Sequence, residues 1–580
     1  GTPADKIIDI GLYEYQYKLD FWKLPGVYVG TIEQGDGDGR DWANQTSDLR
    51  NAIIAMANPD GSSSTGQGNK RTIYVRNGQY FSPTLSAGNA FSLHVNQSDN
   101  WCESVTIKGA CTGEGHGENV KQDFSKQTVI VPSKLPILKA GSLLDILTKN
   151  KPVTIEGLTF NNDYGRGMRV QVDNANGSLK IRNGGFRENL GSGMFVAQNK
   201  GKVLVYNTLF ANNSCMKNIQ NESGDAAKVG NDAALVTTGT TTVVNATFAE
   251  NLGKAVAVSP ETTEFGETSL DKTHVYNSVS WQNEDNKTDI TQNDDGTTTI
   301  ADGSIYANGG AFCSDIQVDN TATTTNYNKA FAYHYDEDKL PGGKINGPEN
   351  ADAMWGPNFT NPAEKDYTLR PSLFLLDRGS NVHYQREVLG DANPAIPETE
   401  LELANKKRLV GGAVDVGAYE QDAQLRQILY VKPISSAENT GESWTKAMGD
   451  LQSAIDLAGL YKRINGKDGF VLVDQNVNED NVKLELDGVH VYGNMNDEKS
   501  AKDATTVTAE EIVKELLRKR HGALESGFKM SKIKNLTINA DAVVDGFNIT
   551  ESANIKKGML GGSLVEANVT GDNGEGVLYN

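Results

Sequence analysis

Two glycine-rich segments carry oxygen-bearing side chains at spacings that could hold a metal ion. They are Asp36-Gly37-Asp38-Gly39-Arg40-Asp41 and Asn293-Asp294-Asp295-Gly296. Hard cations such as Ca²⁺ prefer carboxylate and amide oxygens in turns of this kind. Neither segment completes an EF-hand loop, and Asp-Gly pairs are also ordinary turn residues. Calcium is the one cofactor that the sequence suggests, with these predicted ligands: Asp36, Asp38, Asp41, Asn293 and Asp295.

Aromatic side chains form a second group that could bind a ligand, because an exposed aromatic ring offers a flat platform to a sugar. Four of them lie in or next to a polar segment and are predicted to contact a glycan: Trp281, Tyr333, Tyr335 and Trp355. For any single aromatic residue, packing in the core is the competing hypothesis. Two further residues, Trp42 and Trp444, are expected to lie buried under helices.

No residue pattern selects a catalytic set. Asn161-Asn162-Asp163 and Asp294-Asp295 superficially match the acid and base of an inverting glycosidase, which needs carboxyl groups roughly 6.5–9.5 Å apart. The first lies at a repeated turn and the second in a polar loop, which explains both without chemistry. A calcium-dependent lyase would need acidic residues beside an arginine, and the spacing singles out none of the candidates: Asp173, Glu222, Asp225, Arg166, Arg169, Arg182 and Arg187.

Composition excludes several partners. The net charge of −20 over 580 residues repels nucleic acid and anionic membranes. No apolar run approaches the ~18 residues of a membrane span, and the N-terminus has no features of a signal peptide. We therefore expect a soluble chain or a processed, exported one, without membrane insertion.

Of the four cysteines, Cys102 and Cys111 are either buried small hydrophobes or a short-loop disulfide.

The elements that must position these residues are arranged as a duplication. Val27-Tyr28-Val29, Gly39, Trp42, Asp48-Leu49 and Ala52-Ile53 recur 402 residues later without gaps. In each copy a short strand leads through a glycine-rich turn to an amphipathic helix. We interpret each helix as a cap that covers the end of a repetitive core.

A finer repeat follows the first cap. A small residue or Asn is followed three places later by Phe, in Gly157–Phe160, Asn183–Phe186, Asn207–Phe210 and Asn245–Phe248, with a degenerate copy at Asn277–Ser280. Six residues after each start lies an Asp or Asn: Asp163, Asn189, Asn213, Asn251 and Asn283. The starts are 26, 24, 38 and 32 residues apart, which fits one coil per repeat with loops of varying length.

Stacked parallel strands explain this register. Equivalent positions superpose about 4.8 Å apart, so Phe should stack on Phe and Asn should bond to Asn. An antiparallel sandwich is the alternative, although it does not predict a shared register. We predict an all-β, right-handed parallel β-helix with short capping helices. Residues 1–422 form the first module, with a loop insertion at 284–350, and residues 423–580 begin a second, incomplete module.

Three sequence features resemble a known family. The module opening, the run Asp366-Tyr367-Thr368-Leu369-Arg370-Pro371 and the ending Val414-Asp415-Val416-Gly417-Ala418-Tyr419-Glu420 resemble bacterial surface proteins of the pectate-lyase-like β-helix superfamily, common in gut Bacteroidetes. The Phe-x-x-Asn units are similar to repeats of chlamydial polymorphic outer-membrane adhesins. The resemblance implies export, a cell-surface location and adhesion or glycan contact.

Two functions stay open at this level. The first is a non-catalytic surface protein that binds a polysaccharide, a glycan or a host or matrix ligand. The second is a polysaccharide lyase or glycoside hydrolase, since the superfamily contains both. Gly115-His116-Gly117 matches a motif of β-helix polygalacturonases, but it precedes every candidate carboxylate, so His116 is better interpreted as a loop residue.

Overall fold

The structure is a computed structural model of the whole chain. It describes these residues: 24–57, 70–82, 91–95, 102–133, 141–215, 218–220, 226–228, 233–258, 272–281, 283, 290–292, 298–300, 310–312, 316–319, 359–369, 375–376, 379–390, 395–410, 413–421, 425–433, 440–495, 508–521, 530–561, 564–565, 568–570 and 575–579. The chain forms two compact units, one of Gly1–Ala351 with Asp377–Glu420 and one of Asp352–Leu376 with Gln421–Asn580. The module boundary at 422 stays a prediction.

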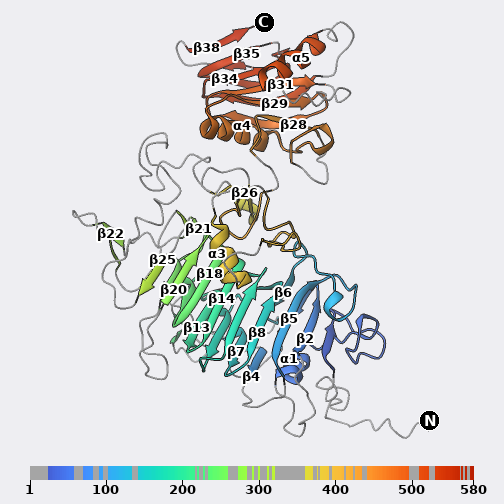
Figure 1. Ribbon diagram of the computed structural model, residues 1–580, viewed down its shortest axis with the longest axis vertical. Coiled ribbons are helices and arrows are strands. Elements are labelled where there is room, and N and C mark those ends of the chain that lie inside the picture. Colours follow the sequence, from blue (N-terminus) through green and yellow to red (C-terminus); the bar gives the residue numbers. More distant parts are fainter. Residues whose placement is uncertain are drawn as a thin grey trace. The chain divides into compact units, whose positions relative to one another are not determined.

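The first unit consists mainly of parallel strands in two sheets (Figure 1). Sheet B contains β4 (Phe91–Val95), β7 (Ser142–Thr148), β10 (Arg166–Val172), β13 (Met194–Asn199), β17 (Ala233–Thr237) and β19 (Lys254–Val258). Sheet A has two rows, joined by the long strands β14 (Lys202–Ala211) and β18 (Thr240–Ala249). Its first row also contains β1 (Gly26–Val29), β2 (Lys70–Arg76), β5 (Ser104–Cys111), β8 (Pro152–Glu156), β11 (Ser178–Arg182) and β20 (Lys272–Tyr276). Its second row adds β3 (Gly78–Phe81), β6 (Thr128–Val131), β9 (Leu158–Phe160), β12 (Gly185–Arg187) and β21 (Ser278–Trp281).

Strand pairing places one aliphatic residue above another along the first row of sheet A. The aligned, buried residues are Val27, Ile73, Ile107, Ile155, Ile181, Val205, Val243 and Val275. Sheet B contributes a matching column, Leu93, Ile146, Val170 and Val196. These columns belong to one apolar core. β-Branched residues suit such positions because their stiff side chains pack well on a pleated surface.

The predicted phenylalanine stack is confirmed. Phe160, Phe186, Phe210 and Phe248 are aligned and almost fully buried. Successive ring centroids are 5.4, 4.9 and 4.8 Å apart, with planes tilted by at most 16°. The next partner of Phe248 is Ser280, so the stack ends there and Trp281 pairs instead with Ala249.

The predicted asparagine ladder is also confirmed. The Nδ2 group of Asn189 donates to Oδ1 of Asn213 at 2.7 Å, Asn213 donates to Asn251 at 2.8 Å, and Asn251 donates to Asn283 at 2.7 Å. The second proton of Asn213 Nδ2 goes to the Phe186 carbonyl at 3.0 Å, and the same contact recurs along the ladder. Asp163 was expected on this ladder and is not: it is exposed, and Asn162 turns inward instead.

The first residue of each repeat has a left-handed backbone conformation. The φ angles are +67° at Gly157, +49° at Asn183, +48° at Asn207, +51° at Asn245 and +46° at Asn277. Asn tolerates this conformation better than most residues, and Gly has no Cβ to oppose it. This requirement explains why the repeat begins with a small residue or Asn.

Different elements cover the two ends of this core. Helix α1 (Leu49–Ala57) buries Leu49, Ala52, Ile53 and Met56 in it, which agrees with the predicted cap. At the other end, β25 (Ile316–Asp319) pairs antiparallel with β20, and β24 (Gly310–Phe312) pairs antiparallel with β21. The predicted loop insertion therefore contains strands, which pair with the strand edges of the stack; it also contains the hairpin β22 (Ile290–Gln292) and β23 (Thr298–Ile300).

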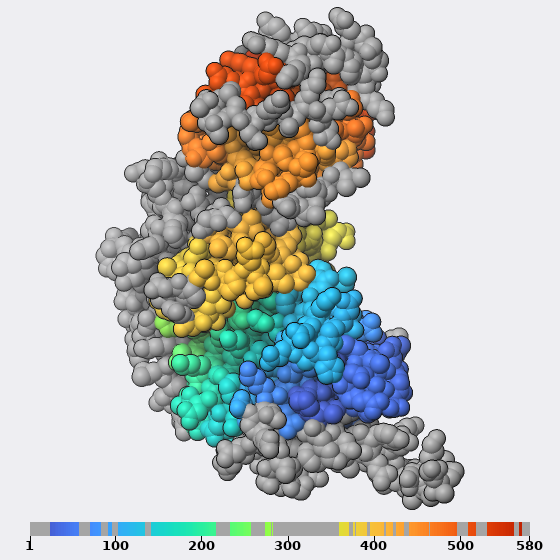
Figure 2. Space-filling view, turned by 45° about the vertical axis from the view of Figure 1, so that its right-hand side comes forward, coloured from blue at the N-terminus to red at the C-terminus, as the bar shows by residue number. Residues whose placement is uncertain are grey.

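Residues 379–420, here called the closing segment, lie against sheet A of the first unit. The segment contains α3 (Asn381–Tyr384) and the π-helical turn η8 (Gln385–Leu389). Its buried apolar side chains, Tyr384, Val388, Ile396 and Val414, pack on Tyr206, Val244 and Tyr276. Figure 2 shows it in yellow to gold beside the cyan and green surface of this unit.

The second unit repeats the opening of the first. It has β28 (Ile428–Val431), the 3₁₀ turn η9 (Trp444–Lys446), helix α4 (Leu451–Asn465), β29 (Gly469–Asp474) and β31 (Val489–Met495), as the duplication predicts. Parallel pairing continues through β33 (Val543–Asp545), β35 (Lys557–Gly561) and β38 (Glu575–Tyr579), and in a second sheet of β30 (Asn478–Leu484), β32 (Ser531–Ile538), β34 (Phe547–Ile555), β36 (Leu564–Val565) and β37 (Asn568–Thr570). Helix α5 (Ala509–His521) begins with the expected capping box between Thr508 and Glu511. The hairpin of β26 (Phe359–Asn361) and β27 (Asp366–Leu369) also belongs to this unit.

The structure decides two local points. Trp444 is buried as expected, with 5% of it exposed, whereas Trp42 is only partly buried. The two rings contact Tyr430 and Tyr28 edge-on at 4.9 and 5.0 Å, and the cluster of Trp444 includes Val513 and Leu516 of α5, with no residue of the predicted cap helix α4. Cys102 and Cys111 are both buried and form no disulfide. Burial raises the pKa of Cys102 to about 11 and that of Cys111 to about 12, so both stay protonated at neutral pH.

The phenylalanine stack predicts how much stability is lost when one of its rings is removed. Phe210→Ala leaves a cavity between the rings of Phe186 and Phe248, and we expect the free energy of unfolding to fall by about 3–5 kcal/mol. Phe81→Ala is the matched control, because Phe81 is 54% exposed, and it should change stability by less than about 1 kcal/mol. Equal urea midpoints for the two variants would contradict the stacking.

The ladder makes a separate prediction. Asn213→Ala removes both the acceptor of Asn189 Nδ2 and the donor to Phe186, leaving buried polar groups unpaired. Each such group costs about 1–3 kcal/mol, so the urea midpoint should fall clearly. Asn176→Ala, at an exposed turn, should leave it unchanged. If both variants behave like the wild type, the ladder does not contribute to stability.

Candidate functional site

Polar and aromatic side chains gather on the outer face of sheet B, here called the sheet B row. Because alternate residues of a strand point to opposite faces, the residues between the buried core positions face outward. Strand register aligns Ser92, Asp145, Arg169 and Phe195 across β4, β7, β10 and β13. His94 and Gln171 lie two residues further along their strands.

A single carboxylate organises this row. Asp145 Oδ2 is 2.9 Å from His94 Nε2, and Asp145 Oδ1 is 3.2 Å from Arg169 Nη1. The same Arg169 nitrogen donates to Gln171 Oε1 at 2.8 Å. The Asp145 side chain is only 6% exposed, whereas His94 is 40% and Arg169 17% exposed. The carboxylate is therefore a buried anchor that orients partly exposed groups above it.

The electrostatics of Asp145 keep it ionised. Burial alone would raise its pKa, but the hydrogen bond from His94 and the charge and hydrogen bond of Arg169 outweigh burial and hold the pKa below its ordinary value. A carboxyl group with a lowered pKa and both oxygens engaged is a poor general acid. Asp145 thus orients neighbours and does not deliver a proton at neutral pH.

An aromatic ring adjoins these polar groups. Phe195 is half-buried, and the guanidinium carbon of Arg166 lies 4.4 Å from its ring centroid. This distance is within the range of a cation–π contact. A flat apolar surface next to fixed hydrogen-bonding groups is the combination that recognises a sugar ring, with one apolar face and several hydroxyls.

The predicted calcium ligands in the described region have other partners. Arg40 contacts Asp36 at 2.8 Å and Asp38 at 3.2 Å. Asp41 lies 4.0 Å from Arg40 as well, accepts from Asn44 at 2.9 Å and caps the turn η3 (Trp42–Asn44). Among the residues that the structure describes, no group of three or more His, Cys, Asp or Glu is arranged to hold a metal ion. The other two predicted ligands, Asn293 and Asp295, lie outside the described residues.

Of the four predicted glycan-binding aromatics, one can be placed. Trp281 ends β21 and is partly exposed, and its carbonyl accepts from the amide of Glu250 at 3.0 Å. It belongs to sheet A and is not part of the sheet B row. Tyr333, Tyr335 and Trp355 lie outside the described residues.

The motif around His116 has a structural explanation. Gly115 and Gly117 have φ angles of +78° and +57°, which allow the loop to turn back. The Gly117 amide donates to the Tyr28 hydroxyl at 2.8 Å, and the His116 ring lies 5.1 Å from that of Tyr28. The loop thus packs on the first strand, as expected for a loop residue.

Sequence reasoning noted Arg166 and Arg169 but missed His94, Asp145, Gln171 and Phe195. A usable pattern was present, since a charged or polar residue interrupts apolar runs such as Leu143-Leu144-Asp145-Ile146. Loops of unequal length separate these strands, so the sequence does not show which polar residues align.

Comparisons with known proteins add no assignment: no family model matches the chain, and no curated protein is significantly similar to it. Within the described parts of the chain, none of the helices has the length and apolar character needed to cross a membrane.

The lowered pKa of Asp145 predicts an acid-dependent loss of stability. An unfolded aspartate titrates near 3.9, so the stabilisation by ionised Asp145 is complete above that pH and is lost as pH falls through its lower folded-state pKa. Asp145→Asn should lower the urea midpoint at pH 7 and have a smaller effect at pH 2.5. The exposed Asp163→Asn serves as control. Equal effects of Asp145→Asn at both pH values would contradict the assignment.

Proposed function

We propose that the strands of the first unit form a right-handed parallel β-helix. Support comes from the order of pairing: β8, β9 and β10 each pair in parallel with β11, β12 and β13, the strands that follow in the same order one repeat later. Right-handed connections are the rule between parallel strands. Such a fold presents long flat faces along its axis, where residues of successive repeats line up.

We further propose that the protein binds glycans at a bacterial cell surface or after secretion, without catalysing a reaction on them. The main observation behind this proposal is the sheet B row, in which ionised Asp145 fixes His94 and Arg169 beside the Phe195 ring. The resemblance to bacterial surface proteins and adhesins supports the location. The ligand we propose is a polysaccharide or a glycan on a host or matrix surface, contacted in addition by Trp281.

A polysaccharide lyase or hydrolase is the second candidate, favoured by the arginine and histidine beside a carboxylate on one sheet face. Hydrolysis requires an acid and a base, usually two carboxyl groups. Within the sheet B row, as far as the structure describes it, Asp145 is the one carboxylate, and both its oxygens are engaged. Binding therefore fits this geometry better than hydrolysis.

Glycan-array binding of purified protein tests the proposal. Phe195→Ala should weaken binding of the recognised glycan at least tenfold, because it removes the apolar platform and the Arg166 contact. Phe81→Ala, the same change on sheet A, should bind like the wild type. Unchanged binding by Phe195→Ala would reject the sheet B row as the site.

The same preparations distinguish the second candidate. Reducing-sugar release and ultraviolet absorbance from unsaturated products are measured across a polysaccharide panel. Turnover that is lost in Asp145→Asn, together with no glycan binding, would replace the binding proposal with an enzymatic one.

A further inference from the structure

The closing segment is held to sheet A by asparagine side chains of successive repeats. Asn207 Nδ2 donates to the Leu401 carbonyl at 3.3 Å and to the Tyr384 hydroxyl at 3.1 Å. One repeat further, Asn245 Nδ2 donates to the carbonyls of Asp415 and Gly417 at 2.7 and 3.1 Å. Asn277 donates to Ser380, which donates back through its amide. The segment is thus a separate layer attached by polar contacts and one apolar cluster.

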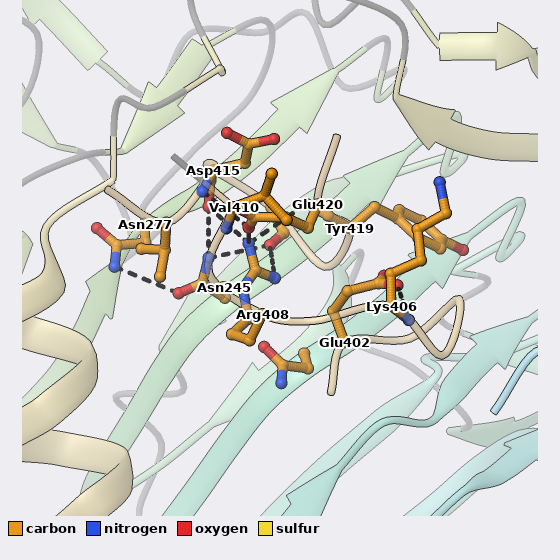
Figure 3. Close-up of polar contacts among 12 residues, drawn as sticks. Asn245, Asn277, Glu402, Lys406, Arg408, Val410, Asp415, Tyr419 and Glu420 are labelled. Carbon is orange, nitrogen blue, oxygen red and sulfur yellow. Dashed lines mark hydrogen bonds and ion pairs between the residues drawn. The ribbon is translucent and has the colours of Figure 1, made fainter. Parts of the chain in front are cut away.

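A buried arginine lies at the centre of this layer (Figure 3). Arg408 is fully buried and donates to the carbonyls of Gly417, Asp415 and Tyr419 and to Glu420 Oε2 at 2.6 Å. The Glu420 carboxylate also accepts from the amides of Val410 and Asp415. The Glu420 carboxyl group therefore has one cationic donor and two backbone donors.

Besides the Arg408–Glu420 pair, the segment buries the carboxyl group of Glu402, which is 0% exposed. The carboxyl group of Glu402 accepts from two backbone amides, those of Ala404 and Lys406, at 2.8 Å each, and the structure describes no ion pair for it. Burying an ion without an ion partner is costly, and protonation relieves that cost.

The charges around Glu402 do not cancel the effect of burial on its pKa. Burial raises its pKa to about 7, and the two backbone amides, Arg408 and Lys406 lower it only in part. At Glu420, burial and the neighbouring Asp415 carboxyl group raise the pKa well above its ordinary value, and Arg408 and two backbone amides offset this only in part. On the sheet side, the Glu400 carboxylate, which accepts from Tyr384 at 2.9 Å, favours the charged forms of Lys180 and Arg182.

We propose that the closing segment is a proton-sensitive clasp, which holds tightly to sheet A at acidic pH and loosens as the buried Glu402 carboxyl group ionises. Loosening would uncover Tyr206, Val244 and Tyr276, a buried apolar patch that continues across three neighbouring strands.

The sign of the effect follows from linkage. Glu402 titrates near its ordinary value of 4.5 when the segment is released and near 7 when it is docked, so the docked state binds the proton more tightly. Docking is strongest below pH 4.5, weakens as pH rises from 4.5 to 7, and changes little above. Between pH 5 and pH 8 the docking equilibrium should fall on the order of 50-fold.

Hydrogen–deuterium exchange of the full chain, normalised to the intrinsic rate at each pH, tests the clasp. Normalised exchange in peptides covering Asn381–Leu389 and 401–410 should rise on the order of 50-fold from pH 5 to pH 8. Exchange in β14, within the core, should stay constant. An equal response of the closing segment and β14 in the wild type would overturn the proposal.

Two matched variants test whether Glu402 is the titrating group. Glu402→Gln keeps the shape of the side chain but cannot ionise, so its closing segment should vary less than fivefold over the same pH range. Glu398→Gln changes a carboxylate whose side chain is 87% exposed and should respond like the wild type. Full pH dependence in Glu402→Gln would reject Glu402 as the sensor. If that variant does not fold, the wild-type comparison with β14 decides alone.

Discussion

Parallel pairing of equivalent strands is the constraint on which the first unit depends. Backbone hydrogen bonds hold neighbouring strands about 4.8 Å apart, and this spacing also suits stacked aromatic rings and asparagine amides. The measured ring separations, 5.4 to 4.8 Å, follow from it. One geometric repeat therefore serves backbone bonding, apolar packing and side-chain hydrogen bonding together, and a slip in register would disrupt all three.

The left-handed residues of the repeats also provide the points at which the closing segment attaches to the stack. Each has a positive φ angle at the bend between the two rows of sheet A. Asn207, Asn245 and Asn277 use their side-chain amides to hold the backbone carbonyls of the closing segment. Two asparagine series thus have different roles: one lies inside the core, and the other binds a covering layer.

Both the sheet B row and the closing segment depend on buried carboxylates, but their environments differ. Asp145 lies between a histidine and an arginine, so its charge is favoured and it can order its neighbours. Glu402 meets backbone amides in a fully buried turn, where burial raises its pKa to about 7. Local charge partners decide which carboxylate is a fixed anchor and which responds to pH.

Sequence periodicity alone determined the parallel stacking, the phenylalanine and asparagine columns, both helices of the duplicated opening and the capping box of α5. These are local or regularly repeated features, so a single chain displays them directly. The failure at Asp163 is instructive, because the repeat spacing predicted Asp163 and only the path of the turn placed Asn162 inside instead.

The tertiary structure alone decided which residues share a face. Asp145, Arg169 and Phe195 are separated by loops of unequal length, and Asn245 donates to the carbonyls of Asp415 and Gly417 across more than a hundred residues. The cap at the far end likewise uses antiparallel strands from a segment with no recognisable repeat. Such proximities arise from the register between strands and from long-range packing, which no local pattern encodes.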